Sequence, residues 1–191
     1  TGLSITRVPM GHEIAVTPLQ IAMAMSVIAN GGNMMLPQIV RSVHDDNGRE
    51  VVAFSPEILR RVVSEDTAAK VGASLVDVVG ERGTARLASI PGFAVAGKTG
   101  TAQRVDPKGG YAAGKYVVSF AGYFPADNPE VAGIVLVDDA RTPGGRNYGG
   151  TVAAPIFARI GEAMARHLEL VPESPTPGAT IALVPFGNGM N

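Results

Sequence analysis

The chain has 191 residues and is nearly neutral, with 16 basic and 17 acidic side chains. Because it has neither an excess of basic residues nor a basic patch, nothing indicates a nucleic-acid partner. The absence of cysteine excludes disulfide bonds and thiolate chemistry, and no apolar run of about 18 residues indicates a membrane span.

The first predicted element is a helix from about Thr17 to Asn30. Thr17 and Gln20 have the spacing of a capping box, and Pro18 takes the first helical position, where no backbone N–H is needed. Gly31-Gly32 is expected to end the helix, because glycine readily takes the left-handed conformation found there. One stripe of apolar side chains predicts a buried face: Ile21, Met25 and Ile28.

A hairpin is predicted next. Asp46-Asn47-Gly48, a strong turn signal, separates two short runs that we expect to pair as antiparallel strands: residues 38–43 and 49–54. Ser55 is then predicted to begin a short helix, and Ser64 a longer one that ends near Val79. Acidic residues follow each serine, and they suit the first turn of a helix.

Three longer strands follow, at residues 93–104, 116–124 and 131–137. A final helix is predicted from about Thr151 to Leu170, with Pro155 in the first turn, where proline is tolerated. The strands are apolar at nearly every position, which predicts that both sheet faces are covered. The predicted fold class is α/β of the α+β type, an antiparallel sheet covered by helices on both faces. The helices in the sequence are few for this task, so we expect a further N-terminal part of the fold.

The last residues, 172–191, differ in composition from the rest of the chain. They are rich in proline, glycine and small side chains, which predicts a loosely attached tail. Within this tail, Ile181–Val184 is apolar enough to add an edge strand to the sheet.

The segment Gly97-Lys98-Thr99-Gly100-Thr101 carries the strongest chemical signal, and three interpretations are open. In the first, Gly92–Thr99 matches the G-x-x-x-x-G-K-[ST] pattern of a phosphate-binding P-loop. A P-loop needs a loop between its glycines and a helix after the Lys-Thr pair. Residues 93–96 instead have the composition of a strand, and Gly100 follows where the helix would begin. The context therefore argues against nucleotide binding.

The second interpretation is the Lys-Thr-Gly strand of serine acyl-transferases that react with penicillins. Such an enzyme binds a peptide as an added strand at a sheet edge, where Gly97 and Gly100 leave room for it. Alternation along the strand places Thr99 and Thr101 on one side and Lys98 on the other. The two hydroxyl groups can hold the terminal carboxylate of the peptide, and the Thr101 N–H is the candidate oxyanion donor. The third interpretation is an ordinary edge strand with a solvated lysine.

The sequence around this motif resembles class B penicillin-binding proteins from about Gly11 to Leu168. Four stretches carry the resemblance: residues 14–20 with 29–32, 83–85 with 95–103, 119–129, and 148–157. Tyr148-Gly149-Gly150 and Pro155-Ile156-Phe157 resemble the division-type (septal) branch of that family.

The resemblance implies a peptidoglycan D,D-transpeptidase, whose serine attacks the D-Ala-D-Ala carbonyl and is also acylated by β-lactams. The family motifs S-x-x-K and S-x-N are absent, so no catalytic residue is assigned here and this chain alone is expected to be inactive. The implied substrate-binding residues are Lys98, Thr99, Gly100 and Thr101, with Tyr148 and Gly149 at the rim of the cleft. The alternative for residues 148–150 is a plain helix-entry turn.

The resemblance also implies partners, location and domain limits. The expected partners are the D-Ala-D-Ala stem peptide, β-lactams as inhibitors, membrane proteins of the division complex, and the N-terminal part of the same protein. The implied location is the periplasmic side of the inner membrane, with an N-terminal anchor outside this chain. Residues 1–171 are expected to form the C-terminal part of a transpeptidase domain, comprising a hairpin-and-helix subregion (36–92) and the sheet with its final helix (93–170). Competing functions are a β-lactam-hydrolysing or β-lactam-sensing relative and a P-loop NTPase.

The remaining polar residues give weaker signals, and no metal or cofactor is expected. The three histidines lack metal-ligand spacing: His12, His44 and His167. Asp138-Asp139 is interpreted as a loop entry in preference to a carboxylate pair, because adjacent strand residues point to opposite faces. Arg141 and Arg146 are interpreted as members of a solvated loop.

Overall fold

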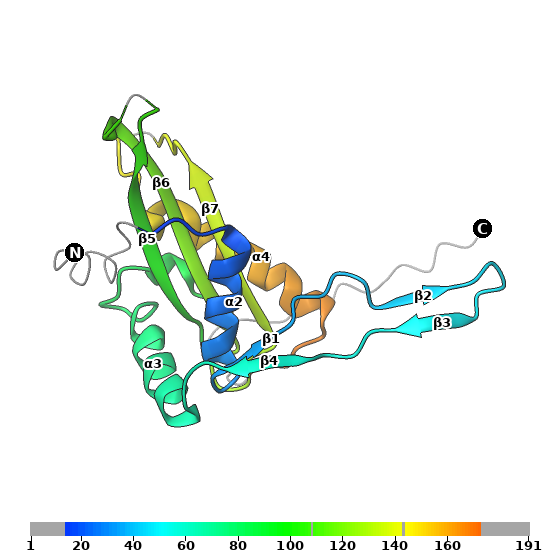
Figure 1. Cartoon of the computed structure of the whole chain (residues 1–191). Coiled ribbons are helices and arrows are strands. Elements are labelled where there is room, and N and C mark those ends of the chain that lie inside the picture. Colours follow the sequence, from blue (N-terminus) through cyan, green and yellow to red (C-terminus); the bar gives the residue numbers. More distant parts are fainter. Residues whose placement is uncertain (1–13, 108, 143, 173–191) are drawn as a thin grey trace, which may run out of the picture.

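The structure is a computed structural model that describes residues 14–107, 109–142 and 144–172 (Figure 1). Its centre is an antiparallel sheet of three strands: β5 (Ala96–Val105), β6 (Tyr111–Phe124) and β7 (Val131–Asp138). The central strand is β6, which places Phe120 opposite Thr99 on one side and opposite Val135 on the other. The three predicted strands are confirmed, although β5 begins at Ala96, three residues later than expected, and β6 at Tyr111, five residues earlier.

Helices pack on both faces of this sheet, as the apolar strands predicted. Helix α4 (Gly149–His167) covers one face, where the ring of Phe157 lies 4.9 Å from that of Phe120. Helices α2 (Pro18–Ala29) and α3 (Glu65–Asp77) pack on the other face. Tyr123 points to that side, and its hydroxyl group lies against Gly72 of α3. Figure 1 shows α2 in front of the sheet and α4 behind it.

The main hydrophobic core lies between the sheet and α4. Phe120 and Phe124 are its largest fully buried side chains. Small residues on α4 and on the segment around the 3₁₀ helix η2 (Arg86–Ala88) complete it: Ala85, Ala88, Ala153, Ala154 and Ala158. Alanine at these positions lets the helix backbone lie close to the aromatic rings, so a close-packed core forms although the chain has few aromatic residues.

The capping signals of the sequence are confirmed at both ends of α2. The Thr17 N–H donates to Gln20 Oε1 at 2.8 Å, and the Gln20 N–H donates to Thr17 Oγ1 at 3.2 Å. Gly31 and Gly32 follow the helix with φ values of 62° and 96°. A Cβ on Gly32 would overlap the carbonyl oxygen of Val63, so this turn requires glycine for space as well as for conformation.

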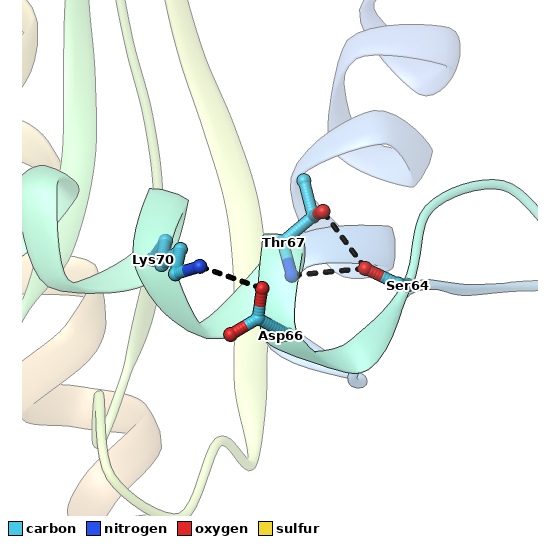
Figure 2. A network of polar contacts seen from close by, with 4 residues as sticks. All are labelled: Ser64, Asp66, Thr67 and Lys70. Carbon is cyan, nitrogen blue, oxygen red and sulfur yellow. Dashed lines mark hydrogen bonds and ion pairs between the residues drawn. The ribbon is translucent and has the colours of Figure 1, made fainter.

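The start of α3 is also confirmed (Figure 2). Ser64 Oγ accepts a hydrogen bond from the Thr67 N–H at 3.1 Å and lies 2.8 Å from Thr67 Oγ1. One turn further along, Lys70 Nζ lies 2.7 Å from Asp66 Oδ2 in an ion pair that is exposed to solvent. The serine cap satisfies a backbone donor at the helix start, whereas the exposed ion pair contributes little stability.

A long two-stranded arm leaves the body of the molecule (Figure 1). Its outer part is a hairpin at the predicted turn, with Gly48 at φ 77°. It is formed by β2 (Ser42–His44), which begins four residues later than predicted, and β3 (Glu50–Ala53). Its inner part pairs β1 (Asn33–Met35) with β4 (Ile58–Arg61). The short helix predicted to begin at Ser55 is therefore wrong. Pairing with β1, in which Met35 lies opposite Ile58 and Asn33 opposite Arg61, supplies the backbone partners that a local helix would otherwise supply.

The final helix runs from Gly149 to His167, so it begins two residues before its predicted start and ends three residues before its predicted end. Because α4 begins at Gly149, Pro155 lies in its second turn instead of its first. Proline has no N–H to donate to the preceding turn, so the helix must be held there by other contacts. The neighbouring Ala153 and Ala154 are fully buried against the core, which provides them.

Apart from Pro172, the predicted tail, with its candidate edge strand Ile181–Val184, lies outside the described residues. In the parts that the structure describes, none of the helices has the length and apolar character needed to cross a membrane.

Candidate active site

The segment Gly97–Thr101 lies extended within β5, at an open margin of the sheet. Among the described residues β5 pairs only with β6, so its other edge carries no strand (Figure 1). This geometry was the central expectation from the sequence. The P-loop interpretation is wrong, because Lys98 and Thr99 are part of a strand that continues to Val105, where a P-loop would require a helix.

The two faces of β5 carry different chemistry. Lys98 and Gly100 lie on the face of their partners Ala121 and Ser119, towards α2 and α3. Thr99 and Thr101 lie on the opposite face, towards the start of α4. The backbone N–H of Gly149 donates to Thr101 Oγ1 at 3.3 Å. The predicted separation of the lysine from the two threonines is thus present in the structure.

The open edge of β5 presents the backbone of both threonines. Lys98 Nζ donates to the carbonyl oxygen of Thr99 at 3.1 Å, so this oxygen does not face β6. In an antiparallel pair, the N–H and C=O of one residue point the same way, and residues two apart share that direction. The N–H of Thr101 therefore also lies at the open edge, where it could donate a hydrogen bond to a developing oxyanion.

Lys98 is exposed and carries a charge that no carboxylate of the described residues neutralises. Its Nζ lies 3.5 Å from Thr99 Oγ1 in addition to its contact with the Thr99 carbonyl. The ammonium group thus folds around the strand edge towards the threonine side. An anionic ligand at that edge would meet one positive charge and two hydroxyl groups.

Glycines allow the start of α4 to pack directly beneath this strand. A Cβ on Gly149 would overlap the carbonyl oxygen of Ser119 and would lie 2.6 Å from that of Gly100. A Cβ on Gly150 would overlap the carbonyl oxygen of Thr84. Gly149 is therefore a buried support of β5, while its neighbour Tyr148 is 60% exposed beside it. The predicted rim position fits the exposure of Tyr148 and does not describe Gly149.

Thr84 joins the site without having been singled out from the sequence. Its Oγ1 lies 3.3 Å from Thr99 Oγ1, although the two residues are 15 positions apart. Only its place beside Gly83 and Ala85, in a stretch that resembles the family, could have drawn attention to it. No local pattern indicates that its hydroxyl group reaches β5.

The two acidic residues at the end of β7 each form an ion pair with an arginine. Asp138 lies 3.6 Å from Arg104, and Asp139 lies 3.1 Å from Arg141. Asp139 has a φ of 53°, which turns the chain out of the strand. These contacts support the loop-entry interpretation, because each carboxylate has its own arginine. In the portion that the structure covers, no group of three or more potential metal ligands comes together.

Comparison with known proteins places this chain in a family. A family model described as the penicillin-binding protein transpeptidase domain matches residues 3–162. Stage V sporulation protein D of Bacillus subtilis is 40% identical over 151 residues, which cover 78% of this chain and 23% of that protein. PbpB of Mycobacterium tuberculosis is 38% identical over 192 residues, covering 96% of this chain and 28% of that protein. FtsI of Escherichia coli is 33% identical and covers 88% of this chain and 26% of that protein.

Solved structures show the same similarity in three dimensions. Penicillin-binding protein 3 from Mycobacterium tuberculosis, complexed with ampicillin, is 35% identical with a TM-score of 0.76. The match covers 89% of this chain and 38% of that one. The predicted fold class is thereby confirmed, and the chain spans about a quarter of the length of the curated relatives. The chain belongs to the penicillin-binding protein transpeptidase family, in its division-type class B branch.

Proposed function

We propose that the protein containing this chain is a peptidoglycan D,D-transpeptidase, and that β5 binds the stem peptide whose acyl group is transferred. The observation that carries this proposal is the open edge of β5, with Lys98 and the hydroxyl groups of Thr99 and Thr101 beside it. A peptide that ends in D-Ala-D-Ala would add to this edge as a further strand. Its terminal carboxylate would meet the hydroxyl groups and the ammonium group.

The contacts of Thr101 prepare it for this role. Its Oγ1 accepts a hydrogen bond from the Gly149 N–H, so the proton of the hydroxyl group remains to be donated to a carboxylate. Its own backbone N–H, at the open edge, would stabilise the negative charge that develops on the carbonyl oxygen under attack. One residue thus serves the substrate through its side chain and the transition state through its main chain.

The covalent steps need a serine and a lysine from an upstream part of the same protein. The serine Oγ would attack the carbonyl carbon between the two D-alanines, and its proton would pass by way of the lysine to the departing amine of D-alanine. The amine of a second stem peptide would then attack the ester and release the serine. No metal or cofactor enters this scheme, and 191 residues without S-x-x-K cannot complete it alone.

β-Lactams are the proposed inhibitors, because they would occupy the same edge and acylate the same serine. Relatives support this, since penicillin-binding protein 3 of Mycobacterium tuberculosis has been solved with ampicillin and with aztreonam. The names of the sporulation and FtsI relatives favour a role in division, with membrane proteins of that process as partners. A periplasmic catalytic domain held by an N-terminal membrane anchor is proposed on the same grounds.

The test is acylation of the complete protein by a fluorescent penicillin. Lys98→Ala is expected to lower the second-order acylation rate by roughly 10²-fold or more, because it removes charge stabilisation from the reacting centre. Lys115→Ala, an exposed lysine on β6, is the matched control and should leave the rate unchanged. Equal rates for wild type and Lys98→Ala would show that β5 has no active role.

A second measurement separates transpeptidase from hydrolase. A transpeptidase should hold the penicillin as a stable adduct, whereas steady turnover of penicillin would favour a β-lactam-hydrolysing relative. The isolated 191-residue chain should gain no mass on incubation with penicillin. A shift of one β-lactam in its intact mass would place a nucleophile within this chain and contradict the proposed division of residues.

A further inference from the structure

A groove of about 390 Å³ lies at the far end of α4 from the candidate active site. It runs between the last turns of α4 and the segment that leads into β5. Its floor is apolar, formed by Ile90, Phe93, Ala165 and Leu170, and charged side chains border it, among them Glu162 and Arg166. The volume lies within the range of about 300–1,000 Å³ that is usual for ligand sites and would accept a few apolar side chains.

The end of α4 directs the chain into this groove. The Leu170 N–H donates to the Ala165 carbonyl at 2.9 Å, and the Glu169 N–H lies 3.3 Å from the Arg166 carbonyl. With Glu169 at a φ of 53°, these bonds form a Schellman turn in which a non-glycine residue takes the left-handed position. The turn lays Leu170 on the groove floor, and Pro172 lines the groove as well. The chain therefore leaves the helix at the mouth of the groove.

The sequence that continues from this point contains an apolar segment without charge. Residues 174–191 have no acidic or basic side chain, and Ile181-Ala182-Leu183-Val184-Pro185-Phe186 is apolar throughout. Tails that stay solvated in water usually combine low hydrophobicity with charge. This segment has the opposite composition, which favours burial. Because it is neutral, it can cover an apolar floor without desolvating a charge of its own.

The tether between groove and segment has a suitable length. Eight residues, 173–180, separate Pro172 from Ile181, and a chain of that length spans at most about 30 Å. Pro177-Gly178 within it is a strong turn signal that would reverse the chain. A segment held so close to a groove has an effective concentration in the millimolar range, which favours it over a partner that must diffuse.

We propose that the segment Ile181–Phe186 docks in the groove between α4 and residues 90–93. It would fasten the last turns of α4 to the segment that precedes β5. This assignment replaces the edge-strand interpretation of Ile181–Val184, and it does not depend on the catalytic function of the protein.

Disulfide trapping in the complete protein tests the docking, since the 191 residues contain no cysteine of their own. Glu162→Cys places a thiol in the groove, and Ala163→Cys places one on the neighbouring, exposed position of α4 that does not line it. Each is combined with a cysteine at Ala179, Ala182 or Gly187 in turn. Docking predicts that at least one tail position forms an intramolecular disulfide with residue 162 at least tenfold faster than with residue 163.

Three results would overturn the proposal. Equal rates at residues 162 and 163 would mean that the tail does not select the groove. A faster reaction with Leu136→Cys, on the outer strand β7, would favour an edge strand. Disulfides between molecules would assign the groove to a second copy. A second readout uses a variant in which serine replaces Ile181, Leu183 and Phe186. This variant should lose the preference for residue 162 and show faster amide hydrogen exchange in residues 90–93 and 162–170. The control, Ser174→Ala with Thr176→Ala, should change neither.

Discussion

Replacing Gly149 by alanine gives the sharpest test of how the candidate site is supported. Gly149 is the first residue of α4, and its N–H donates to Thr101 Oγ1. An added Cβ would overlap the carbonyl oxygen of Ser119 and would come within 2.6 Å of the Gly100 oxygen and 3.1 Å of its nitrogen. All of these are backbone atoms of β5 and β6, so no side-chain rotation can relieve the contact.

Two effects of Gly149→Ala on the free energy of unfolding oppose each other, and their relative sizes decide whether the protein gains or loses stability. Alanine is favoured over glycine in a helix by about 1 kcal/mol, partly because it restricts the unfolded chain. Overpacking costs about 1–3 kcal/mol, and the upper end applies where only backbone can move. We therefore expect a net loss of about 2 kcal/mol in the free energy of unfolding. For a domain of 150–250 residues, that corresponds to a fall of about 4–8 °C in the melting temperature, and the larger complete domain should show a fall no greater than this.

The measurement is a thermal melt of the complete transpeptidase domain, followed by circular dichroism, together with its acylation rate. Gly133→Ala is the control, because a Cβ at this position on β7 would meet no atom within 4 Å. Its unfolding free energy should change by no more than about 0.5 kcal/mol. In Gly149→Ala, displacement of β5 from α4 should also slow acylation, by about 10²-fold for a shift near 1 Å.

A rise in the melting temperature of Gly149→Ala would contradict this prediction. If Gly149→Ala melts at or above the wild-type temperature and reacts normally, helix propensity outweighs the contact. The start of α4 would then not determine the position of β5. A loss of acylation without a change in melting would instead indicate that Gly149 acts on the substrate itself.

Three further changes test other parts of the fold. Ser64→Ala removes the cap of α3 and should lower the free energy of urea unfolding by about 1 kcal/mol. Ser74→Ala is the control and should cost little or nothing, because the Oγ of Ser74 only donates back to the Lys70 carbonyl within the helix. Equal losses for the two variants would contradict the role of Ser64 as a cap. Gly48→Ala should destabilise the arm by about 1–2 kcal/mol, seen as faster hydrogen exchange there, because its φ is 77°; unchanged exchange would show that the turn adapts. Burial raises the pKa of Tyr123 above 10.0, so its contribution to stability is present below pH 10 and lost as the pH rises above it. Tyr123→Phe should flatten this decline, and an identical pH profile for both proteins would exclude Tyr123 as its cause.

The sequence alone determined the local structure of this protein with good accuracy. The capping box of Thr17 and Gln20, the Ser64 cap and the Gly48 turn all depend on residues no more than four positions apart. Their interactions therefore exist wherever the segment lies in the fold. The extended conformation of Lys98 and its neighbours is likewise indicated locally, by the β-branched Thr99 and Thr101 and by the absence of a helical stripe.

The tertiary structure decided which segments meet. The pairing of β1 with β4 replaced a predicted helix, because distant strands offered each other hydrogen bonds that the local sequence does not reveal. The hydroxyl contact between Thr84 and Thr99 and the support of Thr101 by Gly149 arise in the same way, across 15 and 48 residues. The proposed chemistry depends on a motif of four residues that the sequence alone contains, but only the packing of α4 beneath β5 placed its hydroxyl groups, since such contacts depend on the whole fold and not on neighbours in the chain.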